Sequence, residues 1–289
     1  MTIPEGQPAG FSVMSYNIFL GGAGRMEHIT DVVRAVNPDL LGIQEADDEA
    51  AVARLAEAVG MDYVYGRANT IHHVAFLSRF PIVRSHNHPF PGIMRKTMLE
   101  AHVLLPNGSE FVLFVVHLHA AATIGGERRR MREMIAILDS IGSSTHEPHV
   151  IFGDYNALAP GDTVVFRHLT AHYANRMTGA EMGTRRRPRQ VTIGGLLDRG
   201  TQQGLLTSET LLPRHLIRLM LDAGYIDCYR YLHPDEPGHT FPAPDPAVRL
   251  DYMFAPAPMR HRLLACEVID APMVPLASDH RPLVAQFAL

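Results

Sequence analysis

The sequence predicts a mixed α/β fold of the α+β type, and three observations support this class. Between residues 11 and 60, short apolar strand patterns alternate with amphipathic helix patterns. Two later strand patterns, 99–105 and 110–116, are joined by Pro106-Asn107-Gly108, whose Asn-Gly pair favours a tight antiparallel turn. Strand patterns also lie on both sides of the stretch 151–157, and neither half of the chain has a complete set of its own. We therefore expect one domain built from antiparallel strands and helices.

The first 80 residues alternate between strand and helix patterns. The expected strands are 11–19, 40–43, 61–65 and 74–78. In the first helix pattern, 25–36, apolar residues recur at positions i, i+3, i+4 and i+7, and Asn37-Pro38 stops the helix. The second helix pattern, 52–59, precedes Gly60, a residue suited to the left-handed position that ends a helix. Arg79-Phe80-Pro81 is expected to turn the chain after the last of these strands.

The middle of the chain predicts a long helix and then a buried strand. The helix, 126–141, is expected to point four apolar residues inward: Met131, Ile135, Leu138 and Ile141. Its arginines are interpreted as a solvated face: Arg128, Arg129, Arg130 and Arg132. Apolar residues then run from His149 to Phe152, as in a buried strand, and Gly153 breaks the run.

Beyond residue 157 the pattern weakens and then recovers. We interpret 158–207 as an irregular excursion. It contains the basic run Arg185–Arg189, which is either a solvated loop or a loop that faces phosphate or nucleic acid. Ser208 can cap a helix that ends at Gly224 and carries four apolar residues: Leu212, Leu216, Leu219 and Met220. The remaining expected strands are 248–254, 263–269 and the segment after Pro282.

Composition restricts the class of protein but not the substrate. Of 289 residues, 46% are hydrophobic and 19% are charged, which is an ordinary globular composition. The net charge of −4 argues against binding of nucleic acid through positive charge over the whole protein surface. The cysteines Cys228 and Cys266 lack metal-ligand spacing and are expected to be packed thiols. No apolar run has signal-peptide or membrane-span length, so we expect a cytoplasmic protein with one domain, 1–289, and a flexible N-terminus, 1–10.

Polar side chains follow several predicted strands at the point where each strand ends. They are Asn17, Glu45, His117, Asp154, Asn156, Asp251, Asp279 and His280. If the strands run the same way, these groups gather at one edge of a sheet sandwich. Carboxylates and amides without thiolates are suited to Mg²⁺ or Mn²⁺, which prefer oxygen ligands. Imidazoles beside such a cation are suited to acid–base chemistry on a phosphate ester.

Seven short motifs containing these residues occur in an order found in one known superfamily. They are Ser15-Tyr16-Asn17-Ile18, Ile43-Gln44-Glu45, Leu77-Ser78-Arg79-Phe80-Pro81-Ile82, Val116-His117-Leu118, Gly153-Asp154-Tyr155-Asn156, Leu250-Asp251-Tyr252 and Ser278-Asp279-His280. Over residues 11–287 the sequence resembles the endonuclease/exonuclease/phosphatase superfamily, whose fold is that of deoxyribonuclease I. The resemblance implies a four-layer α/β sandwich, with two mainly antiparallel mixed sheets packed face to face and helices outside. It also implies a metal-dependent phosphoesterase that uses Mg²⁺ or Mn²⁺.

The resemblance also implies a metal site and an acid–imidazole pair. By position in the motifs, Glu45 should be the principal metal carboxylate, and Asn17 and Asp279 should complete or support the metal site. His280 should activate the attacking water, oriented by Asp251. A carboxylate beside an imidazole fixes its tautomer and favours the cationic form that arises when the base accepts a proton.

The other matched positions are expected to act on the phosphate. The resemblance implies that Asp154 and Asn156 position the water or the scissile phosphate, and Asp154 is the alternative to the histidine as the base. His117 should stabilise phosphate charge or assist the leaving group. Three further histidines, His72, His73 and His119, lack a clear match. His119 is interpreted as a packed or surface residue, and His73 as a minor candidate for substrate contact.

The resemblance leaves the substrate open, because the superfamily includes nucleases, inositol-phosphate and other phosphatases, and sphingomyelin phosphodiesterases. The expected partner is a phosphate ester, either a small molecule or a nucleic acid. Ala46-Asp47-Asp48 is more acidic than the lysine-bearing segment usual in DNA-repair nucleases, which disfavours that substrate. The region 158–207 departs most from a minimal family member and is expected to shape the substrate pocket.

Two alternatives come from other classes of protein. One is a non-catalytic binding protein on the same scaffold, which the presence of all the key residues disfavours. The other is a zinc hydrolase that uses some of the 17 histidines. No His-Glu-x-x-His motif or comparable ligand spacing supports the zinc alternative.

Overall fold

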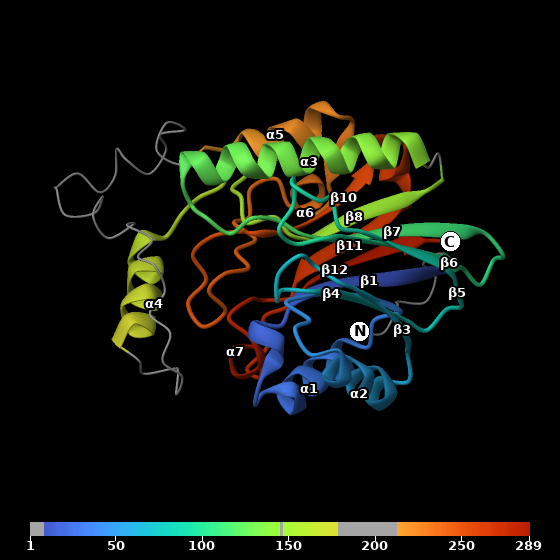
Figure 1. The fold of residues 1–289 in the computed structure, drawn as a ribbon, viewed down its shortest axis with the longest axis horizontal. Coiled ribbons are helices and arrows are strands. Elements are labelled where there is room, and N and C mark those ends of the chain that lie inside the picture. The colour runs from blue at the N-terminus through green and yellow to red at the C-terminus, as the bar shows by residue number, and fades with distance from the viewer. Residues whose placement is uncertain (1–8, 145–146, 179–212) are drawn as a thin grey trace.

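The protein, described here as a computed structural model, is built from two six-stranded sheets that pack face to face (Figure 1). The structure describes residues 9–144, 147–178 and 213–289. Helices cover the outer face of each sheet, so the molecule has four layers (Figure 1). This arrangement confirms the predicted α/β sandwich with mainly antiparallel mixed sheets.

The first sheet joins strands from both ends of the chain. In order across the sheet these are β11 (Leu263–Val268), β12 (Leu283–Ala288), β1 (Gly10–Asn17), β2 (Leu40–Gln44), β4 (Val74–Ser78) and β3 (Asp62–Gly66). β1 pairs in parallel with β2, and the other neighbouring strands are antiparallel. Asn17 therefore lies at the C-terminal end of a central strand, beside Gln44 at the end of β2.

The second sheet contains the predicted hairpin and the strand that leads into the motif at Asp154. In order across the sheet its strands are β5 (Ile82–His88), β6 (Met98–Leu104), β7 (Glu110–His117), β8 (His149–Asp154), β10 (Asp251–Pro256) and β9 (Tyr225–Asp227). β7 pairs in parallel with β8, and the other neighbouring strands are antiparallel. The two sheets thus share one plan, with a parallel pair at the centre of each.

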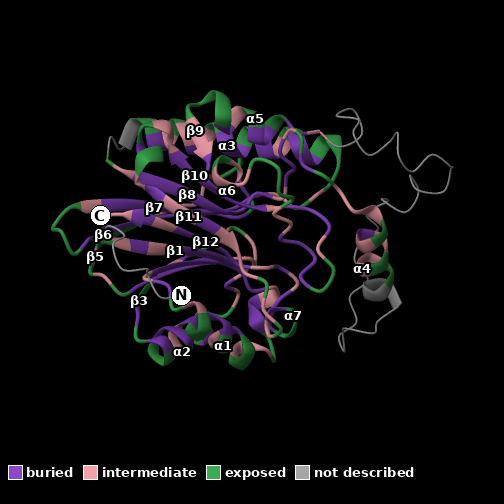
Figure 2. Ribbon diagram, turned by 180° about the vertical axis from the view of Figure 1, so that it is seen from behind, coloured by how far each residue is buried: buried purple, intermediate pink, exposed green. Residues whose placement is uncertain are grey.

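The inner faces of the sheets form one hydrophobic core. Phe11 and Phe76 of the first sheet and Phe111 and Phe152 of the second are buried in the same cluster. The sheets approach closely at Gly42, where an added Cβ would lie 2.3 Å from the ring of Phe152. Buried residues follow the strands of both sheets, and exposed residues lie on the outer sides of the helices (Figure 2). This core holds the two sheets, and any site between them, in a fixed relation.

Three helices cover the first sheet: α1 (Met26–Val36), α2 (Glu49–Val59) and α7 (Val274–Ala277). Their ends follow the predicted signals. Asn37 and Gly60 adopt left-handed conformations as C-caps of α1 and α2. The side chain of Asp48 accepts hydrogen bonds from the backbone N–H groups of Ala50 and Ala51 at the start of α2. The segment after Glu45 is therefore anchored directly to a helix.

The second sheet is covered by α3 (Ile124–Ser144) and α5 (His215–Asp222), and α6 (Cys228–Leu232) follows β9. Both cysteines are buried free thiols, as expected. The helix α4 (Phe166–Thr178) projects to one side of the sandwich (Figure 1). Within the three described ranges, no helix is both long enough and apolar enough to cross a membrane.

The inward face of α3 differs from the prediction. Met134, Ile137 and Ile141 are buried, whereas Ile135 is 45% exposed. The prediction that all the helix arginines are solvated is also wrong, because Arg130 is buried. Arg130 forms an ion pair with Glu127, with 2.8 Å between Nη2 and Oε2, and donates to the carbonyl oxygens of two residues that follow β7. Arg130 is buried because these carbonyl oxygens need a hydrogen-bond donor. The carboxylate of Glu127 offsets the free energy that burial of the guanidinium costs.

Several element boundaries also differ from the prediction. β5 was not expected, because this edge strand is largely exposed and has no apolar alternation. The strand expected over 248–254 begins only at Asp251. α4 is a regular helix inside the region expected to be irregular. The N-terminus is part of the fold from Ala9, whose carbonyl accepts from the Leu289 N–H at 2.9 Å.

Other predictions fall outside the described residues. The helix expected after Ser208 corresponds to α5, which begins at His215. Leu216 and Met220 are buried on its inner face, as predicted. Ser208 itself, Leu212, the basic run Arg185–Arg189 and the terminal residues 1–8 lie outside the described ranges.

Candidate active site

Strand register places three polar side chains in a row at one end of the second sheet. His117, the last residue of β7, pairs with Asp154, the last residue of β8. Asp154 pairs in turn with Asp251, the first residue of β10. Residues directly opposite one another on neighbouring strands point to the same face. The side chains of all three converge and are buried.

Gly153 allows the ends of β7 and β8 to approach each other closely. Gly153 has a φ of 145°, and an added Cβ would lie 1.9 Å from the carbonyl oxygen of Val116. On either side of it, the Leu118 N–H donates to the Asp154 carbonyl and the Tyr155 N–H donates to the Leu250 carbonyl, each at 2.9 Å. The backbone at the row of polar residues is therefore tightly fixed.

We expect Gly153→Ala to lower the free energy of unfolding by about 2 to 4 kcal/mol, because the methyl group must displace the neighbouring strand and the backbone conformation is strained. Urea-induced unfolding followed by circular dichroism measures this change. Gly142→Ala on α3 is the matched control, since a Cβ there has open space and should be neutral or slightly stabilising. Equal stabilities for the two variants would contradict the structural reading of Gly153.

The two carboxylates of this row each pair with an imidazole. His280 Nδ1 is 2.8 Å from Asp251 Oδ2, and His117 Nε2 is 3.3 Å from Asp154 Oδ2. Potential ligand atoms of Asp154, Asp251 and His280 lie within 4.8 Å of one another. The backbone of His280 is held by Ser278, whose hydroxyl accepts from the His280 N–H at 3.1 Å.

The charges of these groups follow from their neighbours. Burial alone would lower the pKa of His280, but the attraction of Asp251 and the hydrogen bond to it raise this pKa to about 10. Burial also disfavours ionisation of Asp154, but the hydrogen bond from His117 and the charge of His280 hold its pKa well below the ordinary range. At neutral pH the site therefore contains a protonated imidazole beside an ionised carboxylate.

Asn17 and Glu45 come from the first sheet and lie beside Asp154. Asn17 Nδ2 donates to Asp154 Oδ2 at 3.0 Å and to Glu45 Oε1 at 3.4 Å. Glu45 follows β2 with a φ of 55°, and its Oε2 accepts from the Leu20 N–H at 2.7 Å. A left-handed conformation at a non-glycine residue costs free energy and is maintained by surrounding contacts. Asn17 thus connects the carboxylates of the two sheets.

A second group of potential ligands surrounds Glu45. Ligand atoms of Glu45, Asp47 and His72 lie within 4.8 Å of one another. His72 Nδ1 is 3.2 Å from Asp47 Oδ2 and 3.8 Å from Glu45 Oε2. Asp47 Oδ1 is buried and has no hydrogen-bond partner among the residues that the structure describes. Two carboxylates, one of them with an unsatisfied buried oxygen, and an imidazole fit a divalent cation.

The remaining predicted residues take different positions. Asn156 Nδ2 donates to the Leu118 carbonyl at 3.2 Å, and the Asn156 N–H donates to Asp154 Oδ1 at 2.9 Å, so Asn156 fixes the carboxylate beside it. The side chain of Asp279 belongs to neither group of potential ligands found among the described residues. His73 Nδ1 accepts from the Ala68 N–H at 2.9 Å, which holds it in the loop between β3 and β4.

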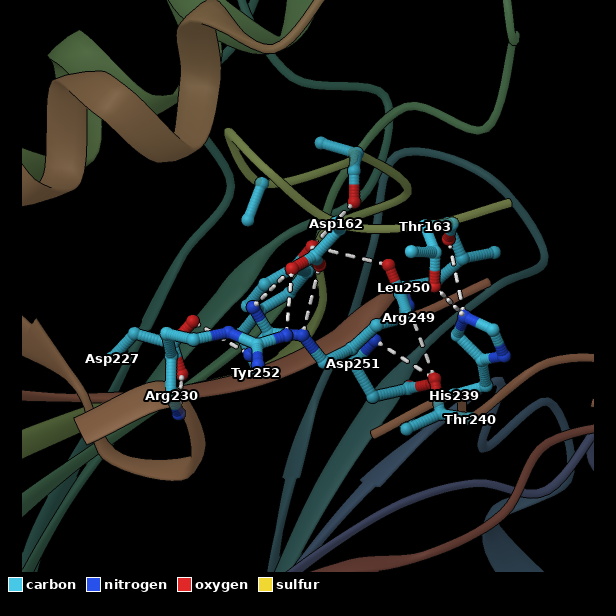
Figure 3. A network of polar contacts seen from close by, with 12 residues as sticks. Asp162, Thr163, Asp227, Arg230, His239, Thr240, Arg249, Leu250, Asp251 and Tyr252 are labelled. Atoms are coloured by element: carbon cyan, nitrogen blue, oxygen red, sulfur yellow. Dashed lines mark hydrogen bonds and ion pairs between the residues drawn. The ribbon is translucent and has the colours of Figure 1, made fainter. Parts of the chain in front are cut away.

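A buried ionic network fixes the backbone immediately before Asp251 (Figure 3). Arg249 is fully buried and donates to Asp162 at 3.0 and 3.2 Å and to Asp227 at 2.6 Å. Thr240 Oγ1 accepts from the N–H groups of Leu250 and Asp251, at 3.1 and 3.2 Å. The network anchors β10 at the residue where it enters the site.

Comparison with known proteins shows the family of the chain. A family-wide sequence model described as "Endonuclease/Exonuclease/phosphatase family" matches residues 14–280. The chain belongs to the endonuclease/exonuclease/phosphatase family. Membership supports hydrolase activity on phosphate esters. No curated protein matches the sequence.

Solved structures share the fold of this family member at low sequence identity. A 3′ phosphatase from Neisseria bound to a product DNA hairpin matches with a TM-score of 0.66 and 18% identity, covering 96% of this chain and 100% of the other. An AP endonuclease from Archaeoglobus fulgidus matches with a TM-score of 0.68, 18% identity and the same coverage. A 3′-5′ exonuclease from Neisseria meningitidis gives 0.66 and 17%, with coverage of 96% and 100%.

Sequence reasoning missed three residues at the site of this family member. Asp47 follows Glu45 by two positions, and the spacing argument that pairs Asp154 with Asn156 would have found it. His72 had no such signal, because it lies in a loop. Lys96 lies next to His117, and Lys96 Nζ donates to the Leu118 carbonyl at 2.8 Å. A lone lysine before a strand gives no indication of burial.

Proposed function

We propose that the protein is a divalent-metal-dependent phosphoesterase that hydrolyses a phosphodiester or phosphomonoester by in-line attack of water. The observation that carries the proposal is the convergence of two buried acid–imidazole pairs, Asp251–His280 and Asp154–His117, beside Glu45. Asn17 links the carboxylates of Asp154 and Glu45, so acid–base groups and potential metal ligands form one site. Metal-assisted hydrolysis of phosphate esters uses both kinds of group.

The metal in this proposal is Mg²⁺ or Mn²⁺, held by Glu45 as the principal carboxylate. Asp47 and His72 lie on the same side and extend the set of ligands expected from the motifs. Asn17 orients Glu45, and Asp279 supports the site through its charge, which acts on His280. The cation, when bound, offsets the negative charge that develops on the phosphate oxygens.

Each acid–imidazole pair has a separate task in the proposed reaction. Asp154 is ionised at neutral pH, so it can orient the water and accept its proton, and Asn156 holds it in position. His280 carries a proton and is held by Asp251, so it donates to the phosphate or the leaving group. This assignment prefers Asp154 to His280 as the base. His117 contacts Asp154 from β7 and stabilises phosphate charge.

The direct test measures hydrolysis of bis-p-nitrophenyl phosphate and p-nitrophenyl phosphate by the purified chain. We expect turnover with Mg²⁺ or Mn²⁺ and loss of turnover in EDTA. Elemental analysis of the active protein tests the zinc alternative. The absence of turnover on both esters, and on a panel of nucleic acids, inositol phosphates, nucleotides and phospholipids, would instead identify a binding protein on this scaffold.

A metal-binding measurement tests the ligands separately from activity. We expect Asp47→Asn and His72→Gln each to weaken Mn²⁺ binding by at least about 10-fold, because metal-site substitutions typically cost 10- to 100-fold in affinity. Electron paramagnetic resonance of free Mn²⁺ during a titration measures this change. Asp62→Asn, on the exposed start of β3, is the charge-matched control and should bind like the wild type. Wild-type affinity in both site variants would remove these residues from the metal site.

Nucleic acid is the second candidate substrate, and the solved relatives favour testing it. The Neisseria 3′ phosphatase is bound to a product DNA hairpin, and the two other relatives are named as nucleases. The acidic net charge and the Ala46-Asp47-Asp48 segment argue for a small phosphate ester instead. Comparing kcat/KM for a DNA 3′-phosphate, an abasic duplex and inositol phosphates decides between the two classes.

A further inference from the structure

Lys96 is a cationic side chain that lies against His117, at one end of the row of polar residues. It lies just before β6, it is only 8% exposed, and its Nζ contacts His117 Nε2 and donates to the Leu118 carbonyl. Burial lowers the pKa of Lys96 from 10.5 to about 8, so the group is mainly an ammonium ion at neutral pH. An ammonium ion has three N–H donors, and the Leu118 carbonyl uses one of them.

Among the described residues, Lys96 has no carboxylate within ion-pair distance. Asp154, Glu45, Glu133 and Asp47 act on its charge from different elements. In the three described ranges, however, none forms a salt bridge with Lys96 at 4.0 Å or less. A buried charge without a contact counterion is costly, and proteins normally pair such a group or place it where a ligand completes its contacts.

The neighbouring imidazole cannot take the place of that counterion. Burial and the positive charge of Lys96 lower the pKa of His117, so the ring is neutral at pH 7. The pair therefore presents one positive charge and one neutral ring beside Asp154. An anionic oxygen that entered between the strand ends would meet an ammonium donor, and such charge-assisted hydrogen bonds are stronger than neutral ones.

We propose that Lys96 is a further catalytic residue, whose ammonium group binds a non-bridging oxygen of the scissile phosphate and stabilises its charge in the transition state. This inference rests on the proposed phosphoesterase function and adds a residue to it. The ammonium group lies against His117, so it reaches the place where Asp154 and His280 would act on the phosphate. An N–H group that the Leu118 carbonyl does not use donates to the phosphate oxygen.

The first test compares Lys96→Met with Lys96→Arg. Methionine has a similar length without charge, and we expect it to lower kcat/KM for bis-p-nitrophenyl phosphate by about 10²- to 10³-fold, as loss of one oxyanion donor typically does. Lys96→Arg restores the charge and should recover part of the lost activity. Arg54→Met on α2 removes an exposed positive charge as the matched control and should behave like the wild type. Wild-type kcat/KM in Lys96→Met would overturn the proposal.

A second test measures phosphate binding and stability without turnover. Titration calorimetry with inorganic phosphate in saturating Mg²⁺ should show weaker binding to Lys96→Met than to wild type. The thermal midpoint of the variant should be unchanged or higher, because the folded environment disfavours the lysine charge. A lower midpoint with unchanged phosphate affinity would show that Lys96 is a structural residue. If the wild type binds phosphate but hydrolyses no ester, the phosphoesterase function fails while the binding role of Lys96 is still measured.

The pH profile gives a third readout. The pKa of Lys96 is lowered to about 8, so its cation is present below this pH and is lost as the pH rises through it. We expect the kcat/KM of the wild type to fall above pH 8. Arginine keeps its proton throughout this range, so Lys96→Arg should lack this fall. An identical alkaline limb in both proteins would assign the titration to another group.

Discussion

Replacing His280 with asparagine is expected to lower kcat/KM for a phosphodiester by about 10²- to 10⁴-fold, the usual contribution of a positioned acid–base group. The imidazole donates from Nδ1 to Asp251, and the asparagine amide can keep a donor toward that carboxylate. The substitution removes the charged ring and its second nitrogen. The loss of activity should therefore exceed any loss of stability. Steady-state kinetics with bis-p-nitrophenyl phosphate, together with thermal unfolding, measures both quantities.

His119→Asn is the matched control for this prediction. His119 lies near His117 in sequence and is partly exposed, and its backbone N–H donates to Glu133 Oε2 at 3.0 Å. Its side chain was interpreted as packed or surface, so the control should keep most of the activity. Equal activity losses for both histidine variants would remove the special role of the Asp251–His280 pair.

Arg249→Met should lower the free energy of unfolding by about 3 to 5 kcal/mol, because breaking a buried ion pair leaves uncompensated charge. Arg249 and Asp162 have fully buried side chains, and Asp227 is nearly so. Methionine fills part of the volume but leaves Asp227 without its ion pair, and Asp162 keeps only the partly exposed Arg230, at 2.9 Å. Urea unfolding measures the loss. Activity should also fall under native conditions, since this network fixes the backbone before Asp251 (Figure 3).

Arg84→Met provides the comparison at the surface. Arg84 forms an ion pair with Glu110 at 2.7 Å, but its side chain is 61% exposed, so its loss should cost less than about 1 kcal/mol. Neutralising Asp162 and Asp227 together with Arg249 should recover part of the lost stability, because among the described residues the only cation that then loses a partner, Arg230, is partly exposed. If the triple variant is as unstable as Arg249→Met alone, packing rather than charge explains the effect.

Periodicity and turn signals predicted most of the fold because these elements are decided locally. Asn37 and Gly60 end their helices where the sequence indicates, and Asn107-Gly108 joins the predicted hairpin. The edge strand β5 was missed because an exposed strand has no need of apolar alternation. The face of α3 was misplaced because Arg130 is buried for the carbonyl groups it satisfies.

In the candidate site too, the sequence predicted the residues that local patterns mark and missed those that depend on tertiary packing. Strand-end position and motif order identified Asp154, Asp251 and His280, which the register and the Ser278 turn bring together. Lys96 could not be predicted, because its importance comes from burial against His117 on a neighbouring strand. Such contacts depend on tertiary packing and leave no periodic pattern in the sequence.

The amide of Asn17 bridges a carboxylate on each sheet, and this has a thermodynamic consequence. A ligand held by both carboxylates could bind strongly only while the two halves of the sandwich stay docked. Binding of this ligand would then hold the two sheets together. The midpoint of global thermal unfolding would rise with ligand concentration, and the effect would not be confined to one loop. On heating, catalytic activity would be lost at the same temperature at which the protein unfolds.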